Sequence, residues 1–263
     1  MYLDRMSYPE VEAYLKEKDS VLIVTGSTEN HGKHMPLGTD TMIPVRIMEM
    51  IEERVGSEIV IAPALPYGCT EDLRGFAGTI SLGMDGLTMV LSRICNQLFD
   101  YGFRHFVILN GHGGNCKAIE QVGLELYARG GLLARVDWWL LAGQLNPFYK
   151  GGHGGGEETA GVMAVDESLI KREWLHEGEN MVNDISDELP TYSWTSSMFR
   201  GGTVTIPRPI NRLTDNGWLA HGMGDDAPDR ATAEWGREML KTVADWAAEL
   251  IPVFARAACP EKR

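Results

Sequence analysis

SVLIVTGSTENHGKHMPLGTD, residues 20–40, joins an apolar run to a polar segment that carries a glutamate, two histidines and an aspartate. The run at residues 20–25 predicts a short buried β-strand. Glu29 and His31 follow the end of this strand, where open α/β sheets bind their ligands, and their spacing puts both side chains on one side of an extended segment. Asp40 follows nine residues after His31. Glu, His and Asp together suit Zn(II) or Mn(II), so this stretch predicts a metal site at a sheet edge.

Strand and helix patterns alternate through the rest of the first half of the chain. The predicted strands are residues 20–25, 59–65, 105–109 and 132–140, and the predicted helices are residues 42–55, 87–99, 117–129 and 156–165. Such alternation implies a mostly parallel sheet flanked by helices, with right-handed crossovers. Residues 168–217 have no clear period and predict irregular structure or short strands, whereas residues 225–256 predict a long amphipathic helix. Because no repeat or linker interrupts the chain, we expect a single α/β domain over residues 1–263.

Composition narrows the class of protein. The net charge is −13, which argues against nucleic-acid or anionic-membrane partners because phosphate binding depends on Lys and Arg. No stretch approaches the roughly 18 consecutive apolar residues of a membrane span, and residues 1–19 lack the apolar core of a Sec signal. The four cysteines are scattered without a CxxC pair, as is typical of reduced thiols. We therefore expect a cytoplasmic protein that acts on a small molecule.

Two further segments place histidines among glycines. NGHGGN, residues 110–115, follows a predicted strand and contains His112, and GGHGGGEET, residues 151–159, contains His153 before two glutamates. Each feature alone has an ordinary alternative: Glu29 as a helix cap, His112 as part of a tight turn, and residues 151–156 as a mobile loop. A dinuclear metal site needs several carboxylates and a few imidazoles, and the coincidence of three such segments favours it.

These segments resemble the signatures of a known family. Residues 26–40 are similar to the opening signature of the creatininase (creatinine amidohydrolase) family, residues 110–115 to its second signature, and residues 153–159 to its third. The resemblance implies an α/β domain, two divalent metal ions per subunit (Zn, Mn or Fe) and a homohexamer. By position, Glu29, Asp40 and His112 would hold one metal. His31 and Asp40 would hold the other, so that Asp40 bridges the two.

The resemblance leaves one ligand to be reassigned. In creatininase the last ligand is a glutamate two residues after the histidine of the second signature, and this sequence has Gly114 there. We expect Glu158 to supply the missing carboxylate, with Glu157 as the alternative. His153 would transfer protons without binding a metal. The implied reaction is hydrolysis by a metal-activated water, with the proton passed to the leaving nitrogen.

The substrate is less well defined by the sequence. Creatininase holds its flat substrate with aromatic side chains; Trp138 or Trp139 falls near one of those positions and Tyr149 near the other. Residues 67–74 are shorter and more charged than we expect for creatinine, and Arg74 is a candidate for an anionic or polyhydroxylated substrate, with a surface salt bridge as the equal alternative. The candidate substrate contacts are Trp138, Tyr149, Thr70 and Arg74. We therefore expect a small amide, formamide or cyclic ketone rather than creatinine.

Two other functions compete with a hydrolase. The chain could be a catalytically inactive family member that serves in binding or assembly, but such a relative would usually have lost a ligand, and all five positions are filled here. A nucleotide-binding module is suggested by the glycine-rich turns. The sequence lacks a GxGxxG motif that opens a helix after the first strand, and it lacks a Walker lysine.

Overall fold

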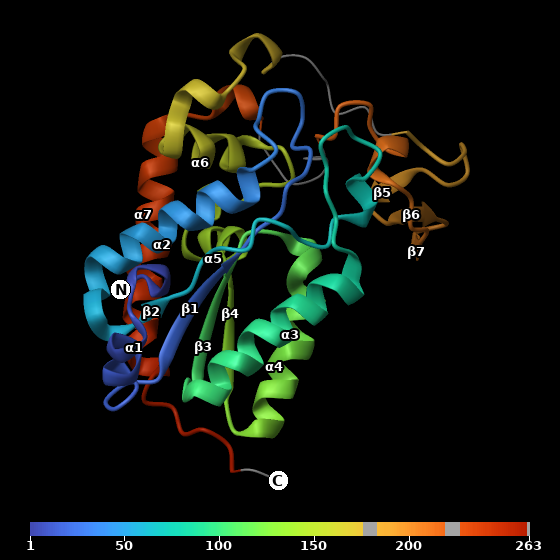
Figure 1. Cartoon of the computed structure of the whole chain (residues 1–263). Helices are drawn as coiled ribbons and strands as arrows, with labels where there is room; N and C mark the ends of the chain where they lie inside the picture. The colour runs from blue at the N-terminus through green and yellow to red at the C-terminus, as the bar shows by residue number, and fades with distance from the viewer. Residues whose placement is uncertain (176–182, 219–226, 262–263) are drawn as a thin grey trace.

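A four-stranded parallel sheet forms the centre of the computed structural model (Figure 1). The structure describes residues 1–175, 183–218 and 227–261. The strand order is β2-β1-β3-β4, with β1 (Ser20–Thr25), β2 (Val60–Ile61), β3 (His105–Asn110) and β4 (Leu132–Asp137). Every pairing in this sheet is parallel. The predicted α/β architecture is therefore confirmed.

Helices cover both faces of the sheet because alternate strand residues point to opposite sides. They are α1 (Tyr8–Tyr14), α2 (Thr39–Val55), α3 (Gly83–Tyr101), α4 (Cys116–Arg129), α5 (Trp138–Leu145), α6 (Gly156–Asp166) and α7 (Ala233–Phe254). Val21 and Ile23 of β1 pack in one buried cluster with residues of α3 and α4. Leu22 and Val24 pack in a second cluster with residues of α2, α6 and α7. Figure 1 shows these two groups of helices on opposite sides of the strands.

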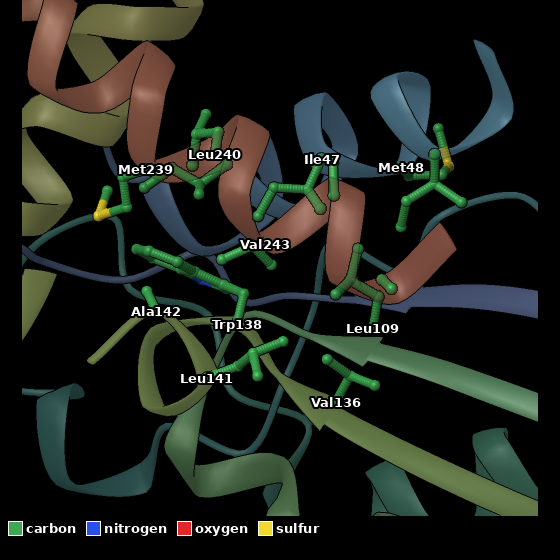
Figure 2. Packing of buried hydrophobic residues seen from close by; sticks show 14 of the residues in the cluster. Ile47, Met48, Leu109, Val136, Trp138, Leu141, Ala142, Met239, Leu240 and Val243 are labelled. Atoms are coloured by element: carbon green, nitrogen blue, oxygen red, sulfur yellow. The ribbon is translucent and has the colours of Figure 1, made fainter. Parts of the chain in front are cut away.

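The predicted fourth strand, residues 132–140, is too long. β4 ends at Asp137 and α5 starts at Trp138. The Trp138 side chain is 1% exposed and lies in the second cluster, and Figure 2 shows it beside Val243 and Leu141. Because α5 turns away from the sheet here, Trp138 is directed into the core instead of continuing the strand.

Other boundaries also differ from the prediction. β2 is two residues long, whereas residues 59–65 were predicted as strand. Helix α2 begins at Thr39, earlier than residue 42, so that Asp40 lies in its first turn. Helix α7 begins at Ala233, where the Thr232 hydroxyl accepts a hydrogen bond from the Trp235 amide at 3.1 Å. The predicted start of this helix, residue 225, lies outside the described residues.

Residues 168–217 contain short strands, as predicted for the described part of this segment. β5 (Thr191–Ser193), β6 (Ser196–Phe199) and β7 (Gly202–Thr205) form a small antiparallel sheet. Figure 1 shows this sheet apart from the central one, beyond the carboxyl ends of the parallel strands. Among the described residues, no helix combines the length and the apolar character needed to cross a membrane.

Candidate metal centre

The sheet register brings the two predicted signature segments together. Thr25 at the end of β1 is paired with Asn110 at the end of β3, so the loops that follow both strands leave the same edge side by side. Gly111 then passes very close to the start of α2: a Cβ placed on Gly111 would lie 1.8 Å from the Asp40 carbonyl oxygen. Only a glycine permits this approach, which sets Asp40 beside the segment that carries His112.

Glu29 is the clearest sign that the site is built for a cation. Its side chain is fully buried, and neither carboxylate oxygen has a hydrogen-bond partner. His112 Nδ1 lies 3.2 Å from Glu29 Oε1, but not in hydrogen-bonding geometry. A buried carboxylate without donors is costly unless a positive charge balances it. The donor set around Glu29 therefore fits a bound metal ion.

Asp40 presents its two oxygens to two different histidines. Oδ1 lies 2.9 Å from His31 Nε2, and Oδ2 lies 3.1 Å from His112 Nδ1. The Ser27 hydroxyl also donates a hydrogen bond to Oδ2 at 2.7 Å. Ser27 is fully buried, so this bond holds the carboxylate in one orientation. An aspartate placed in this way can bridge two cations, each of which also binds one of the histidines.

Backbone carbonyls select the histidine nitrogens that face the carboxylates. His31 Nδ1 lies 3.2 Å from the Glu29 carbonyl oxygen, and His112 Nε2 lies 2.9 Å from the Cys69 carbonyl oxygen. Because a carbonyl only accepts hydrogen bonds, these two nitrogens carry protons. His31 Nε2 and His112 Nδ1 face Asp40: they donate to its carboxylate when the rings are protonated and offer a lone pair to a metal ion when the rings are neutral. Such outer contacts fix the tautomer of metal-binding histidines.

Glu158 completes the second group of candidate ligands. Its Oε2 lies 3.7 Å from His31 Nε2 and accepts a hydrogen bond from the Gly154 amide at 2.7 Å. Burial raises the pKa of Glu158 to about 7. Gly114, which stands where creatininase carries its glutamate, has no room for a side chain: a Cβ there would lie 2.0 Å from the Cys69 carbonyl oxygen and 2.5 Å from His112 Nε2.

The candidate ligands fall into overlapping groups whose donor atoms lie within 4.8 Å of one another. The groups are Glu29–Asp40–His112, His31–Asp40–Glu158 and Glu29–His31–His153. The first two share Asp40, and together they contain all five residues that the sequence predicts as ligands. The third group makes His153 a competing candidate ligand.

The carboxylates around the two central histidines attract positive charge. Burial by itself lowers the pKa of His31, but the neighbouring carboxylates of Asp40 and Glu158 outweigh it and raise the pKa of His31 to about 10. The pKa of His112 is likewise raised well above its usual value against the effect of burial, chiefly by Glu29 and Asp40. Metal ions would have to displace these protons, so metal binding and protonation compete at this site.

His153 stands beside the carboxylates in a different environment. Its ring stacks on the ring of His31 with centroids 4.4 Å apart, and the edge of Trp194 lies against it at 5.1 Å. His153 Nε2 lies 2.8 Å from the Asn30 carbonyl oxygen, so Nδ1 is left facing Glu29 Oε1 at 3.8 Å. Burial, with His31 next to the ring, holds the pKa of His153 well below its usual value. The ring is therefore neutral and has a free lone pair on the side of the metal centre.

A cavity of about 670 Å³ opens over this cluster. The residues that line it differ from the substrate contacts that the sequence predicts. Trp139, not Trp138, lines the cavity, and Lys150 lines it next to Tyr149, whose own side chain is buried in the core.

The other two predicted contacts do not reach the cavity wall. Thr70 is fully buried, and Arg74 is exposed and paired with Glu71 at 2.8 Å; neither lines the cavity. Asp72 from the same charged segment lines it instead, together with Gln144 and Trp194, which the sequence did not single out. The charge of residues 67–74 was a usable signal for Asp72 alone.

Comparison with known proteins identifies the family. The creatinine amidohydrolase family profile matches residues 4–251 of the chain. The chain belongs to the creatininase family. The mycofactocin precursor peptide peptidase of Mycobacterium tuberculosis (strain ATCC 25618 / H37Rv) is 32% identical over 236 residues, which are 86% of this chain and 82% of the relative. The creatinine amidohydrolase of Pseudomonas putida is 30% identical over 135 residues, 49% of this chain and 51% of the relative.

Solved structures agree with this assignment. A structure described as "Creatininase Mn" superimposes with a TM-score of 0.71 and 25% sequence identity, and covers 97% of this chain and 99% of its own. Since the matched relatives are named amidohydrolases and peptidases, the prediction of a creatininase-family hydrolase is confirmed. Groups of metal-binding residues are present among the described residues, as that prediction requires.

Proposed function

We propose that this chain is a dinuclear metal-dependent hydrolase that cleaves a carbon–nitrogen amide bond in a small molecule or short peptide. The observation that carries the proposal is the pair of ligand groups that share Asp40 beneath one cavity. Glu29, Asp40 and His112 would hold one metal, and His31, Asp40 and Glu158 the other. Zn, Mn or Fe would suit these nitrogen and oxygen donors.

The metals and the protein side chains have separate roles. Two divalent cations held by these residues would lower the pKa of a water molecule and polarise the substrate carbonyl. Ser27 holds the Asp40 carboxylate, and the carbonyls of Glu29 and Cys69 hold His31 and His112, so the ligands are oriented before the substrate arrives. Trp139 and Trp194 line the cavity above and give its wall apolar surface.

His153 is placed to move the proton that the reaction must transfer. Its Nε2 donates to the Asn30 carbonyl, so Nδ1 is the nitrogen that can accept a proton from the nucleophilic water and return it to the leaving nitrogen. The 3.8 Å distance from Nδ1 to Glu29 Oε1 and the stacking of the ring on His31 support this role beside the proposed metal ligands. This role requires His153 to act without serving as a metal ligand.

The names of the relatives and the residues that line the cavity indicate the class of substrate. The relative matched over most of the chain is named a peptidase, whereas the creatinine enzyme matches only about half of it. Of the aromatic residues that the resemblance offered as a clamp for a flat ring, Trp138 and Tyr149 are buried in the core, and Trp139 alone lines the cavity. We therefore favour peptides, formamides and other small amides over creatinine, and over cyclic ketones, whose hydrolysis breaks a carbon–carbon bond.

The His153→Ala variant tests the proposed roles. We expect it to keep two metal ions per chain and to lose turnover by about a hundredfold or more, as is usual when a general acid–base group is removed. Metal content by plasma mass spectrometry and hydrolysis of a panel of amides and formamides measure the two quantities. His105→Ala is a matched control, because His105 lies at the opposite end of β3. Loss of a metal in His153→Ala would make His153 a ligand, and unchanged turnover would remove it from the mechanism.

The remaining expectations about the assembly stay predictions. A homohexamer, a cytoplasmic location and the absence of nucleic-acid partners rest on resemblance, composition and charge. Light scattering on the purified protein tests the oligomer directly: a mass near six times 29.1 kDa supports it, and a mass near 29.1 kDa contradicts it.

A further inference from the structure

Lys150 is the sole lysine or arginine in the lining of the cavity, as far as the described residues define it. Its side chain is exposed and forms no salt bridge or side-chain hydrogen bond with the described part of the chain. By contrast, Arg135 is paired with Asp137, and Arg74 with Glu71. Lys150 is thus a positive charge in the cavity wall that has no partner among the described residues.

The fold fixes the position from which this side chain extends. Lys150 follows a short turn in which the Asn146 side chain accepts a hydrogen bond from the Phe148 amide at 3.1 Å, and the Lys150 amide bonds to the Pro147 carbonyl at 3.2 Å. Tyr149 anchors the turn in the core. Helix α5 packs so closely that a Cβ on Gly143 would lie 3.3 Å from the Lys150 Cβ. The base of the lysine is therefore held, while its four-carbon stem is free to reach a ligand.

Apart from Lys150 and the histidines of the metal centre, the charged side chains in the lining of the cavity are carboxylates, which cannot attract an anion. Glu29, Asp40 and Glu158 would be neutralised by the two divalent cations of the proposed site. Two further carboxylates, Asp72 and Glu157, line the same cavity, and neither forms a salt bridge with Lys150. A substrate that fills the cavity can therefore contact one cationic side chain, Lys150, in addition to the metals.

Arg74, the basic residue that the sequence offered for an anionic substrate, does not compete for this role. It lies outside the cavity lining, its side chain is 66% exposed, and it is paired with Glu71. We propose that Lys150 binds an anionic group of the substrate, a carboxylate or a phosphate, while the bond to be cleaved lies at the metal centre. This inference rests on the proposed hydrolase function and adds the class of substrate to it.

Contact with Lys150 should increase the affinity for an anionic substrate by a moderate, measurable factor. An ammonium in open water contributes little to binding. Here Trp139 and Trp194 line the same cavity, so a bound substrate displaces water next to Lys150 and the charge-assisted hydrogen bond strengthens. Hydrogen bonds to charged groups correspond to about a tenfold or larger change in affinity.

Matched hydroxamates provide the test, because the hydroxamate group binds metal centres whatever its tail. Calorimetry on the metal-loaded enzyme compares acetohydroxamate with three types of hydroxamate that have tails of two to four methylenes: a terminal carboxylate, a phosphonate or a neutral amide. We expect one of the anionic tails to bind about tenfold tighter than the amide of equal length. Lys150→Met should abolish this preference, Lys150→Arg should retain it, and acetohydroxamate should bind all three proteins equally.

A control variant tests whether the loss of any positive charge has the same effect as the loss of Lys150. Arg74→Met removes one positive charge outside the cavity lining, so it should keep the preference for the anionic tail. A stronger gain with carboxylate or with phosphonate identifies the anion. Equal binding of charged and neutral tails at every length, or a preference that survives in Lys150→Met, overturns the role of Lys150 alone. Failure of acetohydroxamate to bind the wild-type protein instead overturns the metal centre and, with it, this inference.

Discussion

Ser27→Ala is the most informative single change for the shared role of Asp40. The Ser27 hydroxyl is fully buried and donates a 2.7 Å hydrogen bond to Asp40 Oδ2. A hydrogen bond to a charged group contributes about 1.5–3 kcal/mol, which corresponds to roughly a tenfold to hundredfold change in an equilibrium constant. Loss of a residue that orients a metal ligand typically lowers metal affinity by a similar factor. We therefore expect the overall affinity for the pair of metals to fall by about tenfold to a hundredfold.

Competition against a chromogenic chelator measures this loss with Zn and with Mn. Since Asp40 serves both groups of ligands, both metals should weaken together in Ser27→Ala. Thr28→Ala is the matched control, because the Thr28 hydroxyl donates to the Pro66 carbonyl and not to a ligand. A variant in which one metal keeps its wild-type affinity while the other weakens would refute the bridging role of Asp40. Unchanged affinity for both would refute the orienting role of Ser27.

Three further changes test other parts of the account. Glu158→Gln should lower the affinity for one of the two metals by about a hundredfold in the same chelator assay, whereas Glu157→Gln should leave both affinities unchanged. Equal losses in the two variants would mean that Glu158 is not the specific ligand. In Gly111→Ala the new Cβ would lie 1.8 Å from the Asp40 carbonyl oxygen, so a calorimetric scan should show a loss of about 1–3 kcal/mol in the free energy of unfolding. Gly113→Ala should not show this loss, because the nearest atom to its Cβ, Trp139 Cζ2, lies 3.8 Å away. A hydrogen bond with Asp19 raises the pKa of His105, so the stabilising effect of this pair is complete below about pH 6.5 and is lost as the pH rises through the raised value. Urea unfolding of wild type and Asp19→Asn should therefore converge at high pH, and a gap that widens with pH would contradict this.

The central strands were predictable because each is buried on both sides. β1 and β3 are continuous apolar runs that end at polar signatures, and their pairing in register explains why those signatures meet. The run at residues 132–140 gave no such guidance. Arg135 and Asp137 interrupt its apolar residues, and the short apolar run at residues 138–140 suits either a strand or a helix, so the start of α5 at Trp138 was missed. Of the two tryptophans considered as a substrate contact, Trp139 and not Trp138 lines the cavity.

The candidate ligands were predictable for a local reason, and the cavity wall was not. Glu29, His31 and Asp40 lie in one short segment after a strand, where the sequence itself holds them close together. Trp194 instead comes from the turn between β5 and β6, in a segment with no period, and reaches His153 only through the fold. Lys150 depends on the packing of its turn against α5, which no local sequence pattern specifies.

The central claim is that two metal ions share Asp40, and metal content per chain tests it most directly. Plasma mass spectrometry on protein purified without chelator, beside Asp40→Ala prepared identically, gives the number of ions in each. We expect about two divalent ions per wild-type chain and the loss of both in Asp40→Ala, because each ligand group loses its shared carboxylate. A wild-type chain that stays empty after incubation with Zn and Mn, or an Asp40→Ala variant that retains both ions, would contradict it.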